Sequence, residues 1–454
     1  MKRYAVIGAG HRAGMYVEAL LGRHRGDGEL AAWVEPNPVR AAAFEQMATK
    51  VLGGQRPVYP PAELERALAR EGVERVIVTS LDRAHADLVC RALRAGVDVV
   101  VEKPIAAQAD QAREIAQAVE QTGRDVRLTF NYRYSPRNVA LREVVAGGEL
   151  GKITSVHFDW ALDTMHGADY FRRWHRDKAN SGGLLVHKSS HHFDLVNWWI
   201  GSTPERVFAT GGRRFYGADA GHADGYTASA TERSLRDRGI DPWFLDIAKD
   251  PWLWRLYGEE AQKADGYVRN RCVFDPGVNI EDTLGLVVEY VDGPVLTYSL
   301  VAYSPYEGYR VVINGTQGRA ELTVVERGSV EVAADGTVVL DASSTKVVAG
   351  DPVRPSSERL VVQRHWERAE ERQIVNTAGG HGGGDALLLA DVFAPDGRTD
   401  RLGRAAGLAD GLRASGVGYA GNQSLQSGLP VRLAELGLDL GRTGADRGES
   451  AERR

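Results

Sequence analysis

The stretch Arg3-Tyr4-Ala5-Val6-Ile7-Gly8-Ala9-Gly10-His11-Arg12-Ala13-Gly14 places a short apolar run directly before a glycine loop, and the segment up to residue 23 is predicted to be a helix. Strand, glycine loop and helix in this order are the context in which a G-x-G-x-x-A motif binds a dinucleotide. The first glycine permits a tight turn, the second lets the backbone approach the pyrophosphate, and the small alanine lets helix and strand pack closely. We therefore predict cofactor contacts from Gly8, Gly10, His11, Arg12 and Ala13.

A second predicted strand, residues 29–34, ends at Glu35, about 20 residues past the glycines. An acidic side chain at this point binds the hydroxyls of the adenosine ribose and repels the 2′-phosphate of NADP. The expected cofactor is therefore NAD, with NADP less favoured. The alternative is that Glu35 is only an exposed charge at the end of a strand.

Strands and helices continue to alternate as far as residue 130. Helices predicted near 38–52, 61–72, 84–95 and 108–122 alternate with strands near 75–79, 97–101 and 126–130. This alternation is typical of a doubly wound parallel sheet, so we predict an N-terminal Rossmann domain over residues 1–130. Ligands of such sheets lie outside the carboxyl ends of the strands. Polar residues that follow those ends are predicted cofactor contacts: Ser80, His85, Glu102, Lys103 and Asn131. A surface ion pair is the alternative for Glu102 and Lys103.

Several of these motifs together resemble the glucose–fructose oxidoreductase / inositol dehydrogenase / rhizopine catabolism family, usually called Gfo/Idh/MocA. The resemblance rests on the Val-Ile-Gly-Ala-Gly loop, Glu35-Pro36-Asn37, His85, Ala92-Leu93-Arg94-Ala95-Gly96 and, most specifically, Glu102-Lys103-Pro104. It implies a nucleotide domain with tightly held NAD(P), followed by an α/β domain whose large, mainly antiparallel sheet carries the substrate. It also implies a homo-oligomer, either a dimer or a tetramer.

After residue 130 strands are no longer each followed by a helix, so we predict a substrate-binding domain over residues 131–440. Residues 211–275 read as an insertion with a helical piece near 241–266, which is either a lid over the substrate or an oligomer contact. The tail over residues 441–454 has no apolar period and is predicted to be disordered.

Residues 181–194 carry most of the candidate catalytic groups. A helix from about residue 184 would place His187, His191 and Asp194 on one face, because their spacings are four and three. By the resemblance, His191 matches the family's catalytic histidine, Asp194 matches a later aspartate, and His187 stands where the family has a carboxylate. The predicted catalytic residues are Lys103, His187, Lys188 and His191.

The predicted chemistry is removal of a carbinol proton while the C–H hydride passes to nicotinamide. Either His191 or Lys103 is the base, and a partly desolvated lysine beside other cations suits that role near neutral pH. Histidines packed in the core are one alternative. A divalent metal bound by His187, His191 and Asp194 is a less favoured one, so no metal is expected.

Residues 166–176 combine aromatic rings with hydrogen-bonding side chains, as expected of a sugar-binding loop. A second glycine-rich stretch, residues 379–385, can bring its histidine to the site, although a flexible loop is equally compatible with it. The predicted substrate contacts are Arg133, Asp169, Tyr170, Arg173, His175, Asp194, Tyr306 and His381.

The amino-acid composition limits the classes of molecule that the protein is expected to bind. The 454 residues include 56 basic and 61 acidic side chains, a balance that indicates neither nucleic acid nor a membrane surface as a partner. Two cysteines, Cys90 and Cys272, are too few for a disulfide framework, and no apolar run is long enough to cross a bilayer. We expect a cytoplasmic protein with a small-molecule ligand.

Three functional hypotheses follow. The first is an NAD-dependent oxidoreductase that acts on a secondary hydroxyl of a sugar or glycoside. The second is a redox glycosidase, in which bound NAD oxidises the sugar transiently so that elimination breaks the glycosidic bond. The third is a non-catalytic sugar or nucleotide sensor, which the presence of both Lys103 and His191 disfavours.

Overall fold

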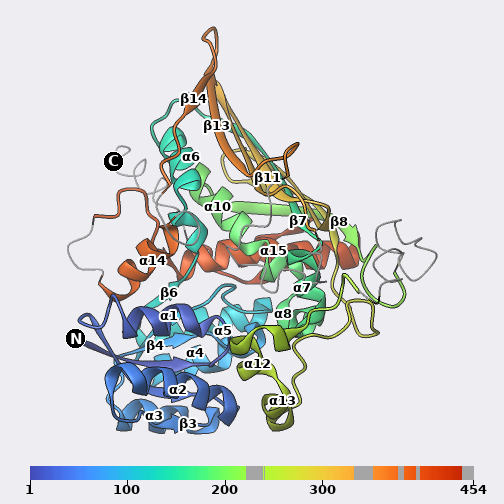
Figure 1. Ribbon diagram of the computed structural model, residues 1–454. Helices are drawn as coiled ribbons and strands as arrows, with labels where there is room; N and C mark the ends of the chain where they lie inside the picture. The colour runs from blue at the N-terminus through green and yellow to red at the C-terminus, as the bar shows by residue number, and fades with distance from the viewer. Residues whose placement is uncertain (221–238, 240, 332–350, 377–382, 395–398, 442–454) are drawn as a thin grey trace, which may run out of the picture.

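The computed structural model describes residues 1–220, 239, 241–331, 351–376, 383–394 and 399–441 (Figure 1). Two β-sheets form the two halves of the molecule, and helices lie between them (Figure 1). The predicted substrate contact His381 and residues 442–454 of the predicted disordered tail lie outside the described residues.

The nucleotide half is a seven-stranded sheet in the order β15-β6-β5-β4-β1-β2-β3. Strands β1 to β6 pair in parallel, and only the short β15 is antiparallel. Its elements, in chain order, are β1 (Lys2–Ile7), α1 (Ala13–Leu21), β2 (Gly28–Val34), α2 (Pro38–Leu52), β3 (Val58–Tyr59), α3 (Leu64–Arg70), β4 (Arg75–Val78), α4 (His85–Arg94), β5 (Asp98–Val101), α5 (Ala109–Thr122) and β6 (Val126–Leu128).

The central strands of this sheet are apolar on both faces because helices cover both. Val99, Val100 and Val101 of β5 are completely buried, as are their neighbours Val76 and Val78 of β4. Such continuous apolar strands are typical of parallel sheets. The sheet order places the carboxyl ends of β1, β4 and β5 side by side, which is where a doubly wound fold binds its ligand.

The other half is a nine-stranded sheet in the order β14-β13-β12-β11-β7-β10-β9-β8-β16. The elements after β6 are α6 (Pro136–Ala146), β7 (Ile153–Asp163), α7 (His166–Arg172), α8 (Lys178–Ser181), α9 (Leu184–His187), α10 (Ser190–Ile200), β8 (Pro204–Gly212), α12 (Pro251–Tyr257), α13 (Glu259–Asp265), β9 (Thr283–Tyr290), β10 (Val295–Ser304), β11 (Glu307–Gly315), β12 (Gly318–Arg327), β13 (Ser357–Arg364), β14 (Glu370–Arg372), α14 (Gly384–Phe393), β15 (Ala406–Gly407), α15 (Leu408–Ser427) and β16 (Val431–Arg432).

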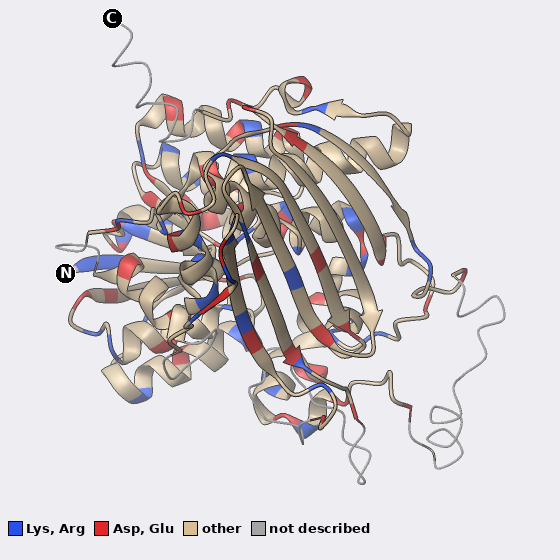
Figure 2. Ribbon diagram, turned by 90° about the horizontal axis from the view of Figure 1, so that it is seen from above, with Lys and Arg blue, Asp and Glu red and all other residues tan. Residues whose placement is uncertain are grey.

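Helices pack against one face of the large sheet. Neighbouring strands are antiparallel except for β7 and β10, which pair in parallel. Leu296, Tyr298 and Leu300 of β10 are buried, and the Tyr298 hydroxyl lies 2.7 Å from Nδ1 of His192 in α10. Figure 2 shows the opposite face, over which no described helix passes. The predicted α/β fold, with a Rossmann sheet and a large, mainly antiparallel sheet, is confirmed.

The 20-residue helix α15 belongs to both halves. It packs on β8 of the large sheet and on the helices α9 and α10. The strand β15, directly before it, pairs with β6 of the nucleotide sheet. Glycines allow the close approach: a Cβ on Gly418 would lie 2.6 Å from the carbonyl oxygen of Leu185. This helix therefore fixes the position of α9 relative to the nucleotide sheet.

The predicted helix that begins near residue 184 is two helices, α9 and α10, separated at Lys188 and Ser189. The Ser189 hydroxyl lies 2.9 Å from the Tyr298 hydroxyl of β10, which anchors the turn to the large sheet. His187 consequently ends one helix, while His191 lies in the first turn of the next.

The predicted insertion contains α12 and α13, which lie against α2 of the nucleotide half. Asn37, which caps α2, donates a hydrogen bond from Nδ2 to the carbonyl oxygen of Ala261 at 2.9 Å. In the described part of the chain, no helix is both long and apolar enough to span a bilayer.

Candidate active site

A cavity of about 830 Å³ extends from the glycine loop to α7, α9 and α10. Two thirds of the predicted site residues line it, at both its nucleotide end and its substrate end. They are Gly8, Gly10, His11, Arg12, Glu35, Ser80, Glu102, Lys103, Asn131, Tyr170, Arg173, His175, His187, Lys188 and His191.

The glycine loop has the shape that a dinucleotide requires. Gly8 has φ +92°, and a Cβ there would lie 2.9 Å from the backbone nitrogen of Ser80, so only glycine fits between β1 and β4. Ala13 is completely buried at the start of α1 and lets the helix pack closely, but it does not line the cavity. The loop thus forms a cradle that a dinucleotide pyrophosphate fits.

One residue of the predicted insertion reaches this loop. Tyr257, the last residue of α12, accepts a hydrogen bond from the backbone nitrogen of His11 through its hydroxyl at 2.8 Å. Tyr267 and Arg271, which follow α13, line the same end of the cavity. The insertion therefore covers the nucleotide end.

Glu35 is buried at the end of β2, with its carboxylate turned toward the glycine loop. It accepts hydrogen bonds from the backbone nitrogen of Ala9 at 2.6 Å and from that of Asn37 at 2.8 Å. Arg40 lies beside it, with Nε 3.4 Å from Glu35, and also forms an ion pair with Asp265. Two carboxylates therefore balance the charge of Arg40.

Glu102 is held by the first helix rather than exposed at the surface. Its Oε1 accepts hydrogen bonds from Nε of Arg12 at 2.6 Å and from the hydroxyl of Tyr16 at 2.7 Å. Burial raises the pKa of Glu102, but the charges of Arg12 and Lys103 and the Tyr16 hydroxyl bring it below its ordinary value. The ionised Glu102 therefore links the backbone next to Lys103 to the start of α1.

Lys103, His187 and Asp82 form a chain of contacts between the two halves. Nζ of Lys103 lies 3.4 Å from Nε2 of His187 and 3.1 Å from its carbonyl oxygen. On the other side of the ring, Nδ1 of His187 lies 2.5 Å from Oδ2 of Asp82. A carboxylate from the nucleotide half thus supports His187.

The pKa values of His187 and Lys103 suit proton transfer. Burial lowers the pKa of His187 well below its ordinary value, and the charge of Lys103 lowers it further. The imidazole is therefore neutral, donating from Nδ1 to Asp82 and accepting at Nε2 from Lys103. Burial also lowers the pKa of Lys103 to about 8, although Asp82 and Glu102 act in the opposite direction.

His191 lies against Tyr132 in the cavity wall. The two rings are stacked, with centroids 4.4 Å apart. Burial and the charges of Lys103 and Lys188 hold the pKa of His191 well below its ordinary value. His191 is therefore neutral at physiological pH.

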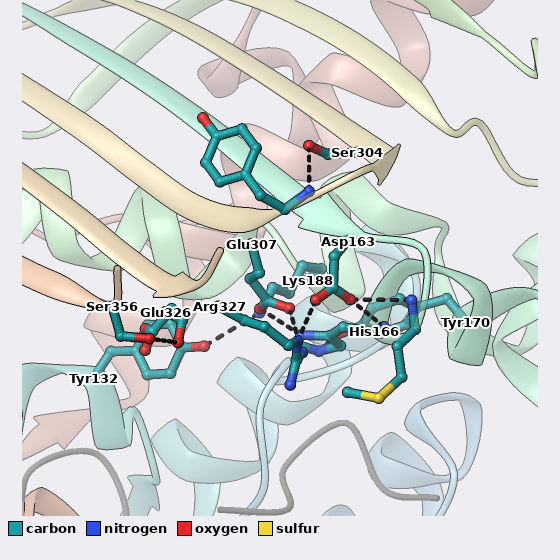
Figure 3. A network of polar contacts seen from close by, with 12 residues as sticks. Tyr132, Asp163, His166, Tyr170, Lys188, Ser304, Glu307, Glu326, Arg327 and Ser356 are labelled. Carbon is teal, nitrogen blue, oxygen red and sulfur yellow. Dashed lines mark hydrogen bonds and ion pairs between the residues drawn. The ribbon is translucent and has the colours of Figure 1, made fainter. Parts of the chain in front are cut away.

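A second cluster of polar side chains lies at the substrate end (Figure 3). Nδ1 of His166 lies 2.7 Å from Oε1 of Glu307, and Nε2 lies 3.1 Å from the hydroxyl of Tyr170. Arg327 forms ion pairs with both Glu307 and Asp163 (Figure 3). The Glu307 carboxylate is thereby fixed behind His166, which lines the cavity.

Some predicted site residues lie outside the cavity lining because they are bound elsewhere. Arg133 and Asp194 form a buried ion pair with Nη2 and Oδ1 2.6 Å apart, and Asp410 binds the same guanidinium. Nδ1 of His85 lies 2.9 Å from the carbonyl oxygen of Pro104.

Two more of the predicted substrate contacts are also held by neighbouring arginines. Asp169 forms ion pairs with Arg173, which lines the cavity, and with Arg269. Tyr306 contacts Arg354, whose Cζ lies 4.0 Å from the centre of the ring. Neither Asp169 nor Tyr306 lines the cavity.

Several lining residues were not predicted, among them Arg40, Tyr132 and Tyr257. His166 and Trp174, which also line the cavity, lie in the predicted sugar-binding stretch 166–176, and Asp82 follows β4 at the ligand edge of the sheet. Tyr257 had no local signal, because its contact joins residues 246 positions apart. Among the described residues, no cluster of three His, Cys, Asp or Glu side chains could hold a metal ion.

A glycine cradle and a lysine–histidine–aspartate chain in one cavity are typical of a dinucleotide-dependent oxidoreductase. Two family models match this chain: "Oxidoreductase family, NAD-binding Rossmann fold" over residues 2–130, and "Oxidoreductase family, C-terminal alpha/beta domain" over residues 142–433. The chain therefore belongs to the Gfo/Idh/MocA family, an NAD-binding oxidoreductase family.

Relatives support the same assignment. The Bacillus subtilis protein named "Putative oxidoreductase YteT" is 31% identical over 446 residues, which cover 96% of this chain and 99% of that protein. Inositol 2-dehydrogenase of Rubrobacter xylanophilus is 30% identical over 212 residues, which cover 45% of this chain and 54% of that enzyme. The structure titled levoglucosan dehydrogenase in complex with NADH shares the fold, with a TM-score of 0.63 and 15% identity over 95% of this chain and 99% of that one.

The Arg133–Asp194 pair leads to a prediction about stability. Asp194→Ala leaves the buried guanidinium with Asp410 as its remaining carboxylate partner, so we expect the free energy of unfolding to fall by about 3 kcal/mol. Urea denaturation measures this loss, with the exposed Glu120→Ala as the control that changes little. Unchanged stability together with lost sugar binding would instead assign Asp194 to substrate binding.

Proposed function

We propose that this protein is an NAD-dependent dehydrogenase that oxidises a secondary hydroxyl of a sugar or glycoside. The observation that carries the proposal is the Asp82–His187–Lys103 chain, which opens on the same cavity as the glycine loop. A base, a hydride acceptor and a substrate hydroxyl must meet for this reaction, and one continuous cavity satisfies that requirement.

In this proposal each residue of the chain has one task. Lys103, as the free amine, takes the hydroxyl proton of the substrate, and the bound nicotinamide supplies the hydride acceptor. His187 accepts a hydrogen bond from the resulting ammonium, and Asp82 holds the imidazole in the tautomer that can accept it. The neutral His191 supplies a further hydrogen-bonding group for the same hydroxyl.

The choice of NAD over NADP rests on Glu35. Its carboxylate, hydrogen-bonded to the glycine loop, would repel a 2′-phosphate. Arg40 lines the same end of the cavity, and its charge is already balanced by Glu35 and Asp265. Arg40 is therefore a poor partner for the extra phosphate.

The redox glycosidase is a second candidate because the cavity holds a second proton-transfer group. Glu307, His166 and Tyr170 form a carboxylate–imidazole–phenol chain at the substrate end. Elimination needs a group that protonates the leaving oxygen in addition to the base at the oxidised carbon. Simple alcohol oxidation needs only one such group.

The first test follows the cofactor and both products together. We expect nicotinamide released from the denatured protein to be NAD, and NADH to accumulate when NAD is supplied with sugars or aryl glycosides. Aglycone release without net NADH would favour the redox glycosidase, and absence of nicotinamide binding would contradict both proposals.

The pKa of Lys103 leads to a pH dependence. Since the free amine is the base, kcat/KM for oxidation should fall as the pH drops below about 8 and level off above it. Reduction of the ketone, which needs the ammonium, should show the opposite slope. A profile measured in both directions checks this, and a midpoint near the ordinary pKa of histidine would assign the base to a histidine instead.

Asp82 should influence that profile through charge. Because the Asp82 carboxylate raises the pKa of Lys103, Asp82→Asn should move the midpoint to lower pH while its amide oxygen still accepts from His187. Asp82→Ala also frees the imidazole, and we expect kcat to fall a further 10- to 100-fold, as on loss of other orienting partners of histidine. The exposed Asp110→Asn serves as the matched control, and an unmoved midpoint in Asp82→Asn would leave Asp82 a purely structural role.

A further inference from the structure

Lys188 is a buried cation that forms no ion pair with any carboxylate of the described residues. It lies in the turn between α9 and α10, is 3% exposed, and lines the substrate end of the cavity. Its ammonium donates one hydrogen bond, to the Tyr132 hydroxyl at 3.2 Å, and lies 4.9 Å from the centre of the Trp160 ring. Within the described part of the chain, no carboxylate forms an ion pair with it and the Tyr132 hydroxyl is its one hydrogen-bond acceptor, although an ammonium has three N–H donors.

The carboxylate that Lys188 influences is already bound by other groups. Lys188 lowers the pKa of Glu307, but Oε1 of Glu307 lies 2.7 Å from Nδ1 of His166 and Oε2 lies 3.2 Å from Arg327. Figure 3 shows Tyr132 on one side of Lys188 and this group on the other. A hydroxyl and aromatic faces compensate only part of the cost of burying an ammonium ion.

The acidic side chains at and behind this end of the cavity are bound by other groups. Arg172, Arg173 and Arg269, of which only Arg173 lines the cavity, surround Asp169. Glu307 is bound by His166 and Arg327, and Asp82 is held by His187. The cations also act on the buried histidines, and the pKa of His191 is lowered by both Lys103 and Lys188. A buried ammonium that faces the cavity, such as that of Lys188, favours a ligand of the opposite charge.

We propose that the substrate is an acidic sugar or its glycoside, and that its carboxylate binds the ammonium of Lys188. The proposal rests on the proposed dehydrogenase function and names its substrate class. The hydroxyl to be oxidised then faces Lys103, while the carboxylate fixes the opposite side of the ring. A carboxylate fits better than a phosphate, because a dianion usually binds several cations or a row of backbone N–H groups.

The test compares uronic acids with the sugars that differ from them only at the carboxyl group. With NAD saturating, we expect kcat/KM for glucuronate or galacturonate to exceed that for glucose or galactose by about tenfold or more, as for other paired charges in a binding site. The uronate methyl ester, which has the shape without the charge, should behave as the neutral sugar does. A preference for the neutral sugar, or for a sugar phosphate, overturns the proposal.

Variants assign the preference to Lys188. Lys188→Met should reduce the ratio of kcat/KM for the acidic sugar to kcat/KM for the neutral sugar to near one. Lys188→Arg keeps the charge and should retain this ratio, so it tests the proposal even if Lys188→Met does not fold. The exposed Lys152→Met is the matched control and should leave the ratio unchanged. If Lys188→Met lowers turnover of acidic and neutral sugars equally, Lys188 acts on the part that they share, and the proposal is wrong.

A binding measurement separates this proposal from the proposed function. Calorimetric titration of the NAD-loaded protein with uronate should show binding that Lys188→Met abolishes. Such binding without turnover of any sugar would contradict the dehydrogenase and leave the carboxylate site in place. Turnover of neutral sugars without uronate binding would support the dehydrogenase and overturn the carboxylate site.

Discussion

The hydrogen bond between Asp82 and His187 is the contact on which the arrangement of the active-site groups depends. Asp82 comes from the ligand edge of the nucleotide sheet and His187 from the last position of α9 in the other half. Because the two residues belong to different halves of the molecule, their contact forms only when the halves are packed together. The tautomer of His187 and its contact with Lys103 then follow from it, which couples the geometry of the base to the packing between the halves.

Local sequence pattern was sufficient for most of the nucleotide half, although it predicted neither β3 nor β15. The glycine loop, the valine-rich β5 and the helix that begins at Pro38 each depend on neighbours within a few residues. Gly8 illustrates the reason: its positive φ and the backbone of Ser80 leave room for no side chain, so the residue type itself reports the geometry. Lys103 was found in the same way, from its position directly after a buried strand.

The parts that sequence pattern missed depend on contacts between distant segments. Asp194 shares a helix with His191, yet its bond to Arg133 turns it into a structural group, and spacing along a helix does not reveal which face meets an arginine. Tyr257 reaches the glycine loop only because α12 packs on α2. Helix α15 is rich in glycine, which disfavours helices in isolation, and burial against two other helices overcomes that preference.

The position of α15 also bears on how the chain acquires its structure during synthesis. Strand β15 completes one edge of the nucleotide sheet, and α15 completes the packing under the large sheet, although both come after residue 405. The ribosome releases the first 130 residues long before these segments exist. The edge of the N-terminal sheet at β6 therefore stays unpaired until the segment after residue 405 has been made.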